Sequence, residues 1–367
     1  MKLSLITMQG VYNYGSALQT YASQKVLTKI GYEVEIVDYY PNRMRNYGSL
    51  KQLYTDAKPF HKNALKCMII AMCKYPSMCK LKKVFVPFSE KYFKKTIAYN
   101  SNFELCENPP LAEVYCTGSD QVWNDYLEGE FDKSYFLNFA PKEAKKIAFS
   151  ASFGRDNISA DELKNVKELL EQYNAISVRE ESGLKILNSI DVEKKKCVLD
   201  PTFLLKKEEW LSLAMPIKEK GYILVYKLHE DSITSEIARE IAKRTGKKII
   251  RLSSDYLKRI KGGTTIVAPK VEEFISYIAN ASLVVTDSFH ATAFSLNLNV
   301  PFVSVKWKMF NDRIETILSK VKLSERSVST VQEALKIYNT EIDFEDTNRF
   351  LEKEVMDTNC FLKEVLD

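Results

Sequence analysis

The stretch LVVTDSFHATAFSLNLNVPFVSV, residues 283–305, decides the fold class of this 367-residue chain. It opens with an apolar, β-branched pattern that predicts a buried strand and ends in a polar corner, Asp287 and Ser288. Helical spacing then predicts a helix that begins with Phe289 and His290, and the segment VPFVSV predicts a second strand. Strand, helix and strand in this order form the βαβ unit of an open α/β sheet.

His290 lies where such sheets bind ligands, at the carboxyl end of a strand and the N-terminus of a helix. The chain has only two other histidines, His61 and His229. Because a free histidine gives and takes protons near neutral pH, we expect His290 to be an acid/base residue. The alternative is a histidine that merely packs at a helix start. Asp120 and Asp287 are alternative bases, better suited to orient a substrate if they are exposed carboxylates.

Length and composition describe a globular protein of two domains. Apolar residues make up 45% and charged residues 28% of the chain, and 53 Lys and Arg against 48 Asp and Glu leave a net charge of +5. This mild excess suits an anionic small ligand and argues against nucleic acid as a partner. Seven cysteines, without CxxC spacing and behind a start that lacks a signal peptide pattern, predict reduced thiols in the cytoplasm.

Strands alternate with helices in both halves of the chain. This predicts two Rossmann-like α/β/α domains, each around a parallel sheet, that face each other across a cleft. We expect the first domain at 1–199, with a helical, basic insertion at about 41–110, and the second at 200–330. A helical tail at 331–367 is expected to pack back on the first domain.

The insertion carries an apolar run, Cys67–Cys73, between Lys66 and Lys74. At seven residues this run is far shorter than the roughly 20 that span a bilayer. A basic surface with an apolar segment at 58–83 could contact the inner face of an anionic membrane. A core helix with a solvated lysine face is the favoured interpretation.

Two segments that follow predicted strands carry polar and glycine residues. The loop QGVYNYGSALQTYA begins at Gln9 and leads into a helix that we expect Ser16 to cap. Ser16 stands where a P-loop needs lysine, and GxGxxG is absent, which argues against an ordinary nucleotide site. GSDQVWN, residues 118–124, follows a second strand and is either part of a site or a turn in which Asp120 accepts backbone N–H groups.

Arg179 ends a predicted strand in the middle of the chain. Its guanidinium group offers a rigid fork of donors to a carboxylate or a phosphate, so it is a candidate anion ligand. The alternative is a surface ion pair with Glu180 or Glu181, which would contribute little to stability.

Five motifs occur in one order along nearly the whole chain: NYGSALQTYA, TGSDQVWN, SVREESG, DPTFLL and TDSFHATAFS. Together they resemble the polysaccharide pyruvyl transferase family, in a variant with GSDQ and SFH motifs. That family is similar in architecture to the two-domain GT-B glycosyltransferases, with donor and acceptor in the interdomain cleft. Its characterised members transfer the enolpyruvyl unit of phosphoenolpyruvate to two sugar hydroxyls and form a pyruvate ketal. The resemblance requires no metal, and no cofactor besides phosphoenolpyruvate as co-substrate.

The resemblance also assigns residues. The family's histidine, at the helix N-terminus after the last long strand, matches His290. Its mid-chain arginine matches Arg179, and Asp120 falls in the GSDQ motif. Family members with studied chemistry usually carry arginine two positions before the histidine, where this chain has Ser288. We expect the donor to contact Arg179, Ser288, Phe289, Lys306 and Arg313, with Lys306, Lys308 or Arg313 supplying the missing charge.

The resemblance places the acceptor on the first domain, at Asn13, Tyr14, Gly15, Gly118, Ser119, Gln121 and Trp123. Trp123, with Tyr12 or Tyr14, could stack on a sugar face, although aromatic residues as frequent as 20 Tyr and 19 Phe more often belong to the core.

The prediction is therefore a pyruvyl transferase that acts on a cell-surface polysaccharide or its lipid-linked precursor. One alternative is a GT-B glycosyltransferase that uses a nucleotide sugar, for which the sequence shows no recognisable nucleotide clamp. Another is a non-catalytic glycan-binding relative. Ser288 favours that second alternative, and the retention of His290 and Arg179 argues against it.

Overall fold

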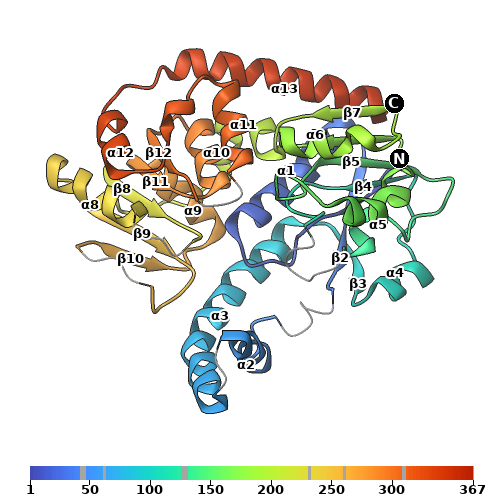
Figure 1. The fold of residues 1–367 in the computed structure, drawn as a ribbon, viewed down its shortest axis with the longest axis horizontal. Coiled ribbons are helices and arrows are strands. Elements are labelled where there is room, and N and C mark those ends of the chain that lie inside the picture. Colours follow the sequence, from blue (N-terminus) through green and yellow to red (C-terminus); the bar gives the residue numbers. More distant parts are fainter. Residues whose placement is uncertain are drawn as a thin grey trace.

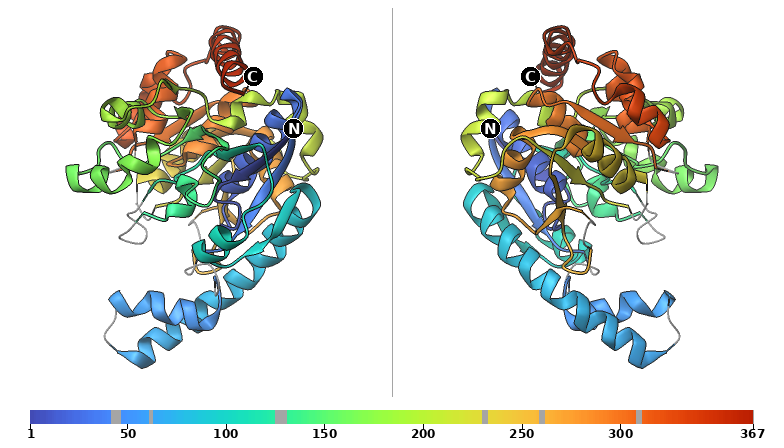
Figure 2. Two further views of the ribbon diagram at one scale, coloured as in Figure 1. Left: turned by 90° about the vertical axis from the view of Figure 1, so that its right-hand side faces the viewer. Right: turned by 90° about the vertical axis from the view of Figure 1, so that its left-hand side faces the viewer.

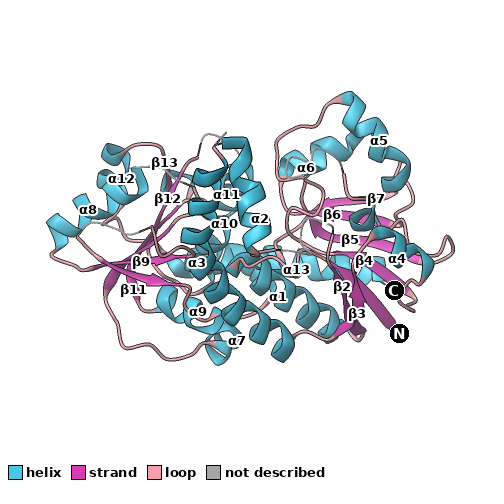
Figure 3. Cartoon of the chain, turned by 90° about the horizontal axis from the view of Figure 1, so that it is seen from below, coloured by secondary structure: helices cyan, strands magenta, loops and turns pink. Residues whose placement is uncertain are grey.

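The computed structural model describes residues 1–41, 47–60, 63–124, 131–229, 233–258, 262–307 and 311–366. Two parallel sheets form the centres of two α/β domains that lie side by side (Figures 1 and 3). This arrangement confirms the predicted fold class.

The first sheet has seven parallel strands in the order β3-β2-β1-β4-β5-β6-β7. Their bounds are β1 Lys2–Ile6, β2 Glu33–Tyr39, β3 Lys95–Tyr99, β4 Val114–Thr117, β5 Lys145–Ala151, β6 Ala175–Val178 and β7 Lys194–Cys197. Strand numbers rise outward on both sides of the β1–β4 pair, as in dinucleotide-binding folds. The topological switch point, where the direction of the strand order reverses and such sheets bind ligands, therefore lies between β1 and β4.

The second sheet repeats this plan with six strands in the order β10-β9-β8-β11-β12-β13. Their bounds are β8 Tyr222–Tyr226, β9 Ile249–Ser253, β10 Thr264–Val267, β11 Ala281–Thr286, β12 Phe302–Val305 and β13 Ser327–Val328. All five residues of β8 are buried, which explains its uninterrupted apolar pattern, because a central parallel strand is covered on both faces. The second switch point lies between β8 and β11.

Helices cover both sheets. The first part of the chain contributes α1 Tyr14–Ile30, α2 Leu50–Ala57, α3 Ala64–Tyr92, α4 Asn102–Glu107, α5 Ala160–Leu170, α6 Glu181–Ile186 and α7 Lys207–Leu213. The second part contributes α8 Ile233–Thr245, α9 Val271–Ala279, α10 Phe289–Asn297, α11 Asp312–Lys320, α12 Val331–Ile337 and α13 Phe344–Leu366. None of the described helices is both long and apolar enough to cross a bilayer.

Helix α1 begins two residues earlier than the sequence pattern indicated. Asn13, and not Ser16, is its N-cap, and the Asn13 side chain accepts hydrogen bonds from the backbone N–H groups of Gly15 and Ser16. The prediction of Ser16 as the cap was wrong because its hydroxyl donates to Asp120, which lies across the switch point.

The segment between β2 and β4 differs from its prediction. The sequence pattern predicts two helical patches here, near 62–74 and 79–95, but α3 is one helix of 29 residues that contains Pro76 and Pro87. Proline removes a backbone donor and usually ends a helix, so Pro76 interrupted the sequence pattern. β3, which forms the edge of the first sheet, was also missed. Helix α2 and the outer half of α3 project away from the two domains (Figures 1 and 2).

The last helix, α13, runs from the second domain back across the first, and both chain ends lie there (Figure 1). The Tyr32 hydroxyl donates to the backbone oxygen of Leu366 at 2.7 Å. Lys194 forms an ion pair with Glu364 at 2.9 Å. The C-terminal helix thus belongs to the packing of the first domain.

Candidate active site

A cleft of about 410 Å³ opens where the two switch points face each other. Its first-domain wall comes from the loops after β1 and β4, and its second-domain wall from the loops after β8, β11 and β12. The lining side chains include Asn13, Ser16, Asp120, Gln121, Asn124, His229, Asp287, Ser288, Phe289, His290, Trp307, Asn311 and Arg313. Open α/β sheets bind ligands at this position, and the volume lies in the usual range of small-molecule sites.

His290 is held tightly at the floor of this cleft. A β-carbon built on Gly15 would lie 2.0 Å from His290 Nδ1. On the other side, Nε2 lies 3.9 Å from Asp200 Oδ2, and no described residue hydrogen-bonds to it. Burial lowers the pKa of His290 to about 4, although Asp200 and Asp120 oppose the shift. At neutral pH the imidazole is therefore uncharged and can accept a proton or a hydrogen bond.

Asp120 is fixed as a carboxylate beside His290. Its backbone adopts a left-handed conformation (φ 79°), which is uncommon outside glycine and often marks functional positions. Its side chain accepts from Ser16 at 2.5 Å and pairs with Arg179 at 3.2 Å. Burial raises the pKa of Asp120, but Arg179, His290, the Ser16 hydrogen bond and Arg313 together outweigh it, and the result is a pKa of about 2. Asp120 can therefore orient groups in the cleft and cannot readily donate a proton.

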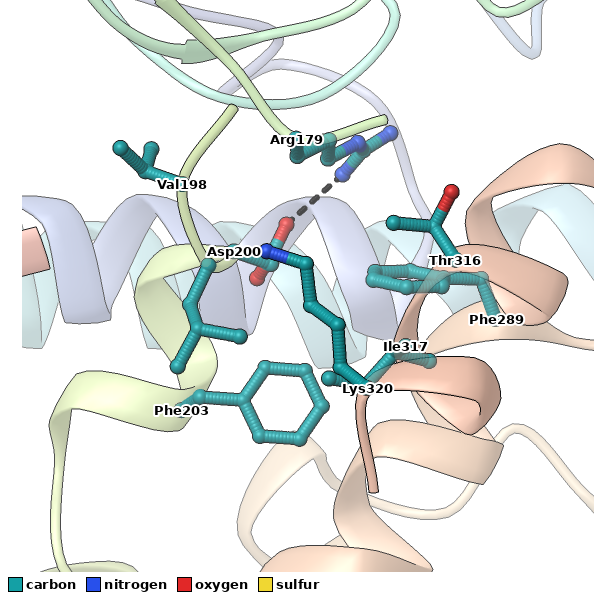
Figure 4. Close-up of a pocket in the computed structure, with 9 residues that line it drawn as sticks. Arg179, Val198, Asp200, Phe203, Phe289, Thr316, Ile317 and Lys320 are labelled. Atoms are coloured by element: carbon teal, nitrogen blue, oxygen red, sulfur yellow. Dashed lines mark hydrogen bonds and ion pairs between the residues drawn. The ribbon is translucent and has the colours of Figure 1, made fainter. Parts of the chain in front are cut away.

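Arg179 lies behind this carboxylate and does not line the cleft. Its side chain is fully buried and also pairs with Asp200 at 2.8 Å (Figure 4). With Asp120 and Asp200 on its two terminal nitrogens, the guanidinium presents no free terminal nitrogen to a donor anion. The predicted donor contact of Arg179 therefore does not fit its position. The alternative, an ion pair with Glu180, is present, with Nε 3.8 Å from Glu180 Oε2, but both side chains are buried and the pair does not lie at the surface.

Arg313, at the start of α11, is the arginine that lines the cleft. The Gln121 amide, oriented to satisfy both of its neighbours, accepts from the guanidinium at 2.8 and 3.2 Å. Among the residues that the structure describes, no carboxylate lies within ion-pair distance of Arg313. Burial, followed by repulsion from Arg179, lowers the pKa of Arg313 to about 10, so the group stays charged at neutral pH. The Phe289 ring lies 5.2 Å from the Arg179 guanidinium and 5.7 Å from that of Arg313.

A second histidine lines the opposite part of the cleft. His229 follows β8, and its Nδ1 lies 3.1 Å from Asp287 Oδ2. Asp287 also accepts from the backbone N–H groups of Leu228 and His229, at 2.7 and 2.9 Å. The imidazole stacks on Trp307, with ring centres 4.7 Å apart and planes within 6°, and 35% of the side chain is exposed. Asp287 thus orients a ring that a ligand can reach.

Neither His229 nor Trp307 was predicted from the sequence as a site residue. The rule that pointed to His290, a histidine directly after a buried strand, applies equally to His229 and would have found it. Trp307 follows β12 and carries no comparable signal. His61 and Lys308 lie outside the described residues.

The structure brings seven of the predicted site residues to the cleft: Asn13, Asp120, Gln121, Ser288, Phe289, His290 and Arg313. Ser288 is there as the N-cap of α10, where its hydroxyl accepts from Ala291 N–H. Lys306 lies elsewhere, in an exposed pair with Glu315.

The remaining predicted acceptor contacts lie beneath the surface. Trp123 is fully buried, and its ring stacks on Phe136 with centres 5.5 Å apart, so it cannot stack on a sugar. Tyr14 is enclosed between the domains, where it stacks on Phe274. Gly15, Gly118 and Ser119 are buried and do not line the cleft. The Ser119 hydroxyl donates a hydrogen bond to the Asp200 carboxylate.

The described ranges contain no group of three or more His, Cys, Asp and Glu side chains placed to hold a metal ion.

Comparisons with known proteins agree with this architecture. A family model described as polysaccharide pyruvyl transferase matches residues 13–309, whereas no curated protein matches the chain by sequence. The solved UDP-GlcNAc 2-epimerase of Methanocaldococcus jannaschii is 14% identical, with 96% of this chain and 99% of that chain covered and a TM-score of 0.54. The Neisseria meningitidis UDP-GlcNAc 2-epimerase is 12% identical, with 100% and 99% covered and a TM-score of 0.53. At these identities the likeness to both structures concerns the fold alone.

Proposed function

The chain belongs to the polysaccharide pyruvyl transferase family, and we propose that it moves the enolpyruvyl group of phosphoenolpyruvate onto two hydroxyls of a sugar to form a pyruvate ketal. The acceptor is a cell-surface polysaccharide or its lipid-linked oligosaccharide precursor. Phosphoenolpyruvate is the co-substrate, and the reaction needs no other cofactor.

The observation that carries this proposal is the position of Arg313. Its charged guanidinium lines the cleft with no carboxylate partner among the described residues, beside the N-terminus of α10. A helix N-terminus favours negative charge, and guanidinium binds carboxylates and phosphates through paired hydrogen bonds. Phosphoenolpyruvate carries both anions. Arg313 therefore supplies the charge that Ser288, in place of the usual arginine, does not.

The reaction requires one proton to be added at C3 and one to be removed from each acceptor hydroxyl. The oxygen of the first hydroxyl bonds to C2 of phosphoenolpyruvate as C3 gains a proton, and that hydroxyl loses its own proton to a base. The bond between C2 and the phosphate oxygen then breaks. The second hydroxyl adds to C2, and its proton leaves with inorganic phosphate.

Two histidines in the cleft divide these tasks. His290, neutral because burial lowers its pKa to about 4, is suited to accept the proton of the acceptor hydroxyl. His229, whose Nδ1 lies 3.1 Å from Asp287 Oδ2, is held with its ring oriented in the cleft and is suited to deliver the proton to C3. Asp120 orients the acceptor hydroxyl as a permanent hydrogen-bond acceptor.

Two alternatives use the same cleft. Nucleotide-sugar chemistry is suggested by the shared fold, because the Neisseria structure is described as bound to UDP-GlcNAc, and the exposed His229 and Trp307 pair could contact a base. A non-catalytic glycan-binding relative would use the cleft only to hold a sugar.

Thermal unfolding with candidate ligands separates the three functions. A ligand at 100 times its Kd stabilises the folded state by about 2.7 kcal/mol, which shifts Tm by a few degrees. We expect phosphoenolpyruvate to raise Tm and Arg313→Ala to abolish the shift, whereas Lys306→Ala should keep it. Incubation with a glycan acceptor should then release inorganic phosphate in equal amount to the ketal formed.

Each other outcome points to a different function. A Tm shift with UDP-GlcNAc and none with phosphoenolpyruvate would replace the proposal with glycosyl transfer or epimerisation. A shift with oligosaccharides alone, without phosphate release, would identify a glycan-binding protein.

A further inference from the structure

The projecting hairpin consists of α2 and the outer half of α3, residues 64–75 (Figure 2). Its two helices bury few side chains, mainly Leu53 and Ala57 of α2 and Cys67 and Ala71 of α3. The rest of this part of α3 faces solvent. It therefore contributes little to the core of either domain, and the core-helix interpretation favoured from the sequence does not describe it.

An apolar stripe runs along the solvent side of this part of α3. Leu65, Met68, Ile69 and Met72 follow the i, i+3, i+4, i+7 spacing of one helix face. Their exposed fractions are 70%, 45%, 52% and 60%. A stripe of exposed apolar residues on one helix face marks a surface that binds something apolar.

The same hairpin is positively charged. Residues 50–75 contain five lysines and one acidic residue, Asp56. This short segment therefore carries a net charge of +4, against +5 for the whole chain. Among the described residues, neither Lys66, within the stripe's span, nor Lys74, just after it, forms an ion pair. A partner for this surface must be apolar inside and negatively charged outside.

The inner half of α3 ties the hairpin to both domains next to the cleft. Phe85 stacks on Tyr12, with ring centres 5.8 Å apart, and Tyr12 lies between two residues that line the cleft, Val11 and Asn13. Toward the second domain, the Ser77 hydroxyl lies 3.1 Å from an oxygen of Asp255. Whatever the hairpin binds is thus connected to the cleft region through one continuous helix.

We propose that this hairpin docks the protein on the surface of an anionic lipid bilayer. The stripe from Leu65 to Met72 enters the boundary between head groups and acyl chains, and the lysines contact lipid phosphates. The hairpin lies on the membrane and does not cross it. A second copy of the chain is a poorer occupant, because two such lysine-rich surfaces repel each other. The proposal is independent of the donor, so it stands or falls separately from the proposed function.

Vesicle flotation of the full chain tests this surface. We expect binding to vesicles of phosphatidylcholine mixed with phosphatidylglycerol, little binding to pure phosphatidylcholine, and weaker binding as salt rises. The double variant Ile69→Ser/Met72→Ser should reduce the partition coefficient about tenfold or more, and Lys66→Glu/Lys74→Glu should do the same. Leu111→Ser, at a residue 87% exposed in the first domain, and Lys218→Glu/Lys220→Glu are the matched controls and should bind as the unmodified chain does.

All of these substitutions lie on exposed side chains, so circular dichroism should show unchanged folding. The proposal is overturned if the chain ignores anionic vesicles, or if the stripe variants bind as tightly as the controls. It is also overturned if the chain self-associates in solution and Ile69→Ser/Met72→Ser abolishes that association, because the stripe would then be a contact between copies.

Discussion

Gly15 lies so close to the His290 imidazole that a β-carbon on residue 15 would stand 2.0 Å from Nδ1. The first turn of α1, in the first domain, therefore forms a wall against a side chain of the second domain. Asp200 confines the same ring from the other side. The two domains together fix the imidazole at the floor of the cleft.

Gly15→Ala should therefore displace His290. We expect a loss of about 1 to 3 kcal/mol in the free energy of unfolding, as for other overpacked sites, together with a large drop in kcat. Urea unfolding of Gly15→Ala, His290→Ala and the double variant forms a cycle that measures the contact. Removing the imidazole makes room, so Gly15→Ala should cost little in the His290→Ala background. An equal cost in both backgrounds would show that the strain lies elsewhere.

The low pKa of His290 predicts how stability depends on pH. Its value is about 4 in the folded protein against 6.5 for a free histidine, so the unfolded chain binds more protons between these limits. Stability from this residue is complete above about pH 6.5 and falls as pH decreases, by about 3 kcal/mol at pH 4. Urea unfolding across this range should show the loss in the unmodified chain and a smaller loss in His290→Gln. Identical pH dependence in the two proteins would contradict the assignment. Asp120, with a pKa of about 2 in place of 3.8, should add a further loss only below about pH 4.

The buried ion pairs of Arg179 should be essential to folding stability. Arg179→Met leaves Asp120 and Asp200 buried without their cation, which typically costs about 3 to 5 kcal/mol. Lys29→Met is the matched control, because Lys29 pairs with Glu209 at an exposed site, where a pair contributes at most about 1 kcal/mol. Chemical denaturation measures the free energy of unfolding of both variants. A loss for Arg179→Met no larger than that of the control would mean that the two carboxylates are not held by this arginine.

The repeated βαβ pattern and the strand-end rule were sufficient to predict the central strands of both sheets, though not the edge strand β3, and to bring Asp120, Ser288 and His290 to one cleft. Arg179 was also recognised as an anion ligand, but its anions are the protein's own. Its partner Asp120 is 59 residues away in the sequence, and such long-range pairing depends on the strand order, which periodicity does not determine. Trp123 was misassigned for a related reason, because the residues that enclose it, Phe136 and Phe153, come from later segments.

Arg313 should control donor affinity. We expect Arg313→Ala to raise KM for phosphoenolpyruvate strongly and Arg313→Lys to restore only part of it, because lysine lacks the paired donors of guanidinium. Lys306→Ala removes a nearby exposed charge that already pairs with Glu315 and should leave KM unchanged. Steady-state kinetics at saturating acceptor measure KM for phosphoenolpyruvate in each variant. If Arg313→Ala and Lys306→Ala raise KM equally, the donor responds to the overall positive charge of this region and not to a specific contact with Arg313.

His229 and Asp287 should act as a unit in proton transfer. Removing a general acid or base usually lowers the rate about 10² to 10⁴-fold, so His229→Gln should reduce kcat by that amount while phosphoenolpyruvate still raises Tm. Asp287→Asn keeps the shape but removes the charge that orients Nδ1, and it should lower kcat less than His229→Gln does. Trp307→Phe preserves a ring for stacking and serves as the control, with kcat near that of the unmodified chain. If His229→Gln keeps full kcat, the proton on C3 must come from another group, and His290 would then be the remaining histidine in the described cleft.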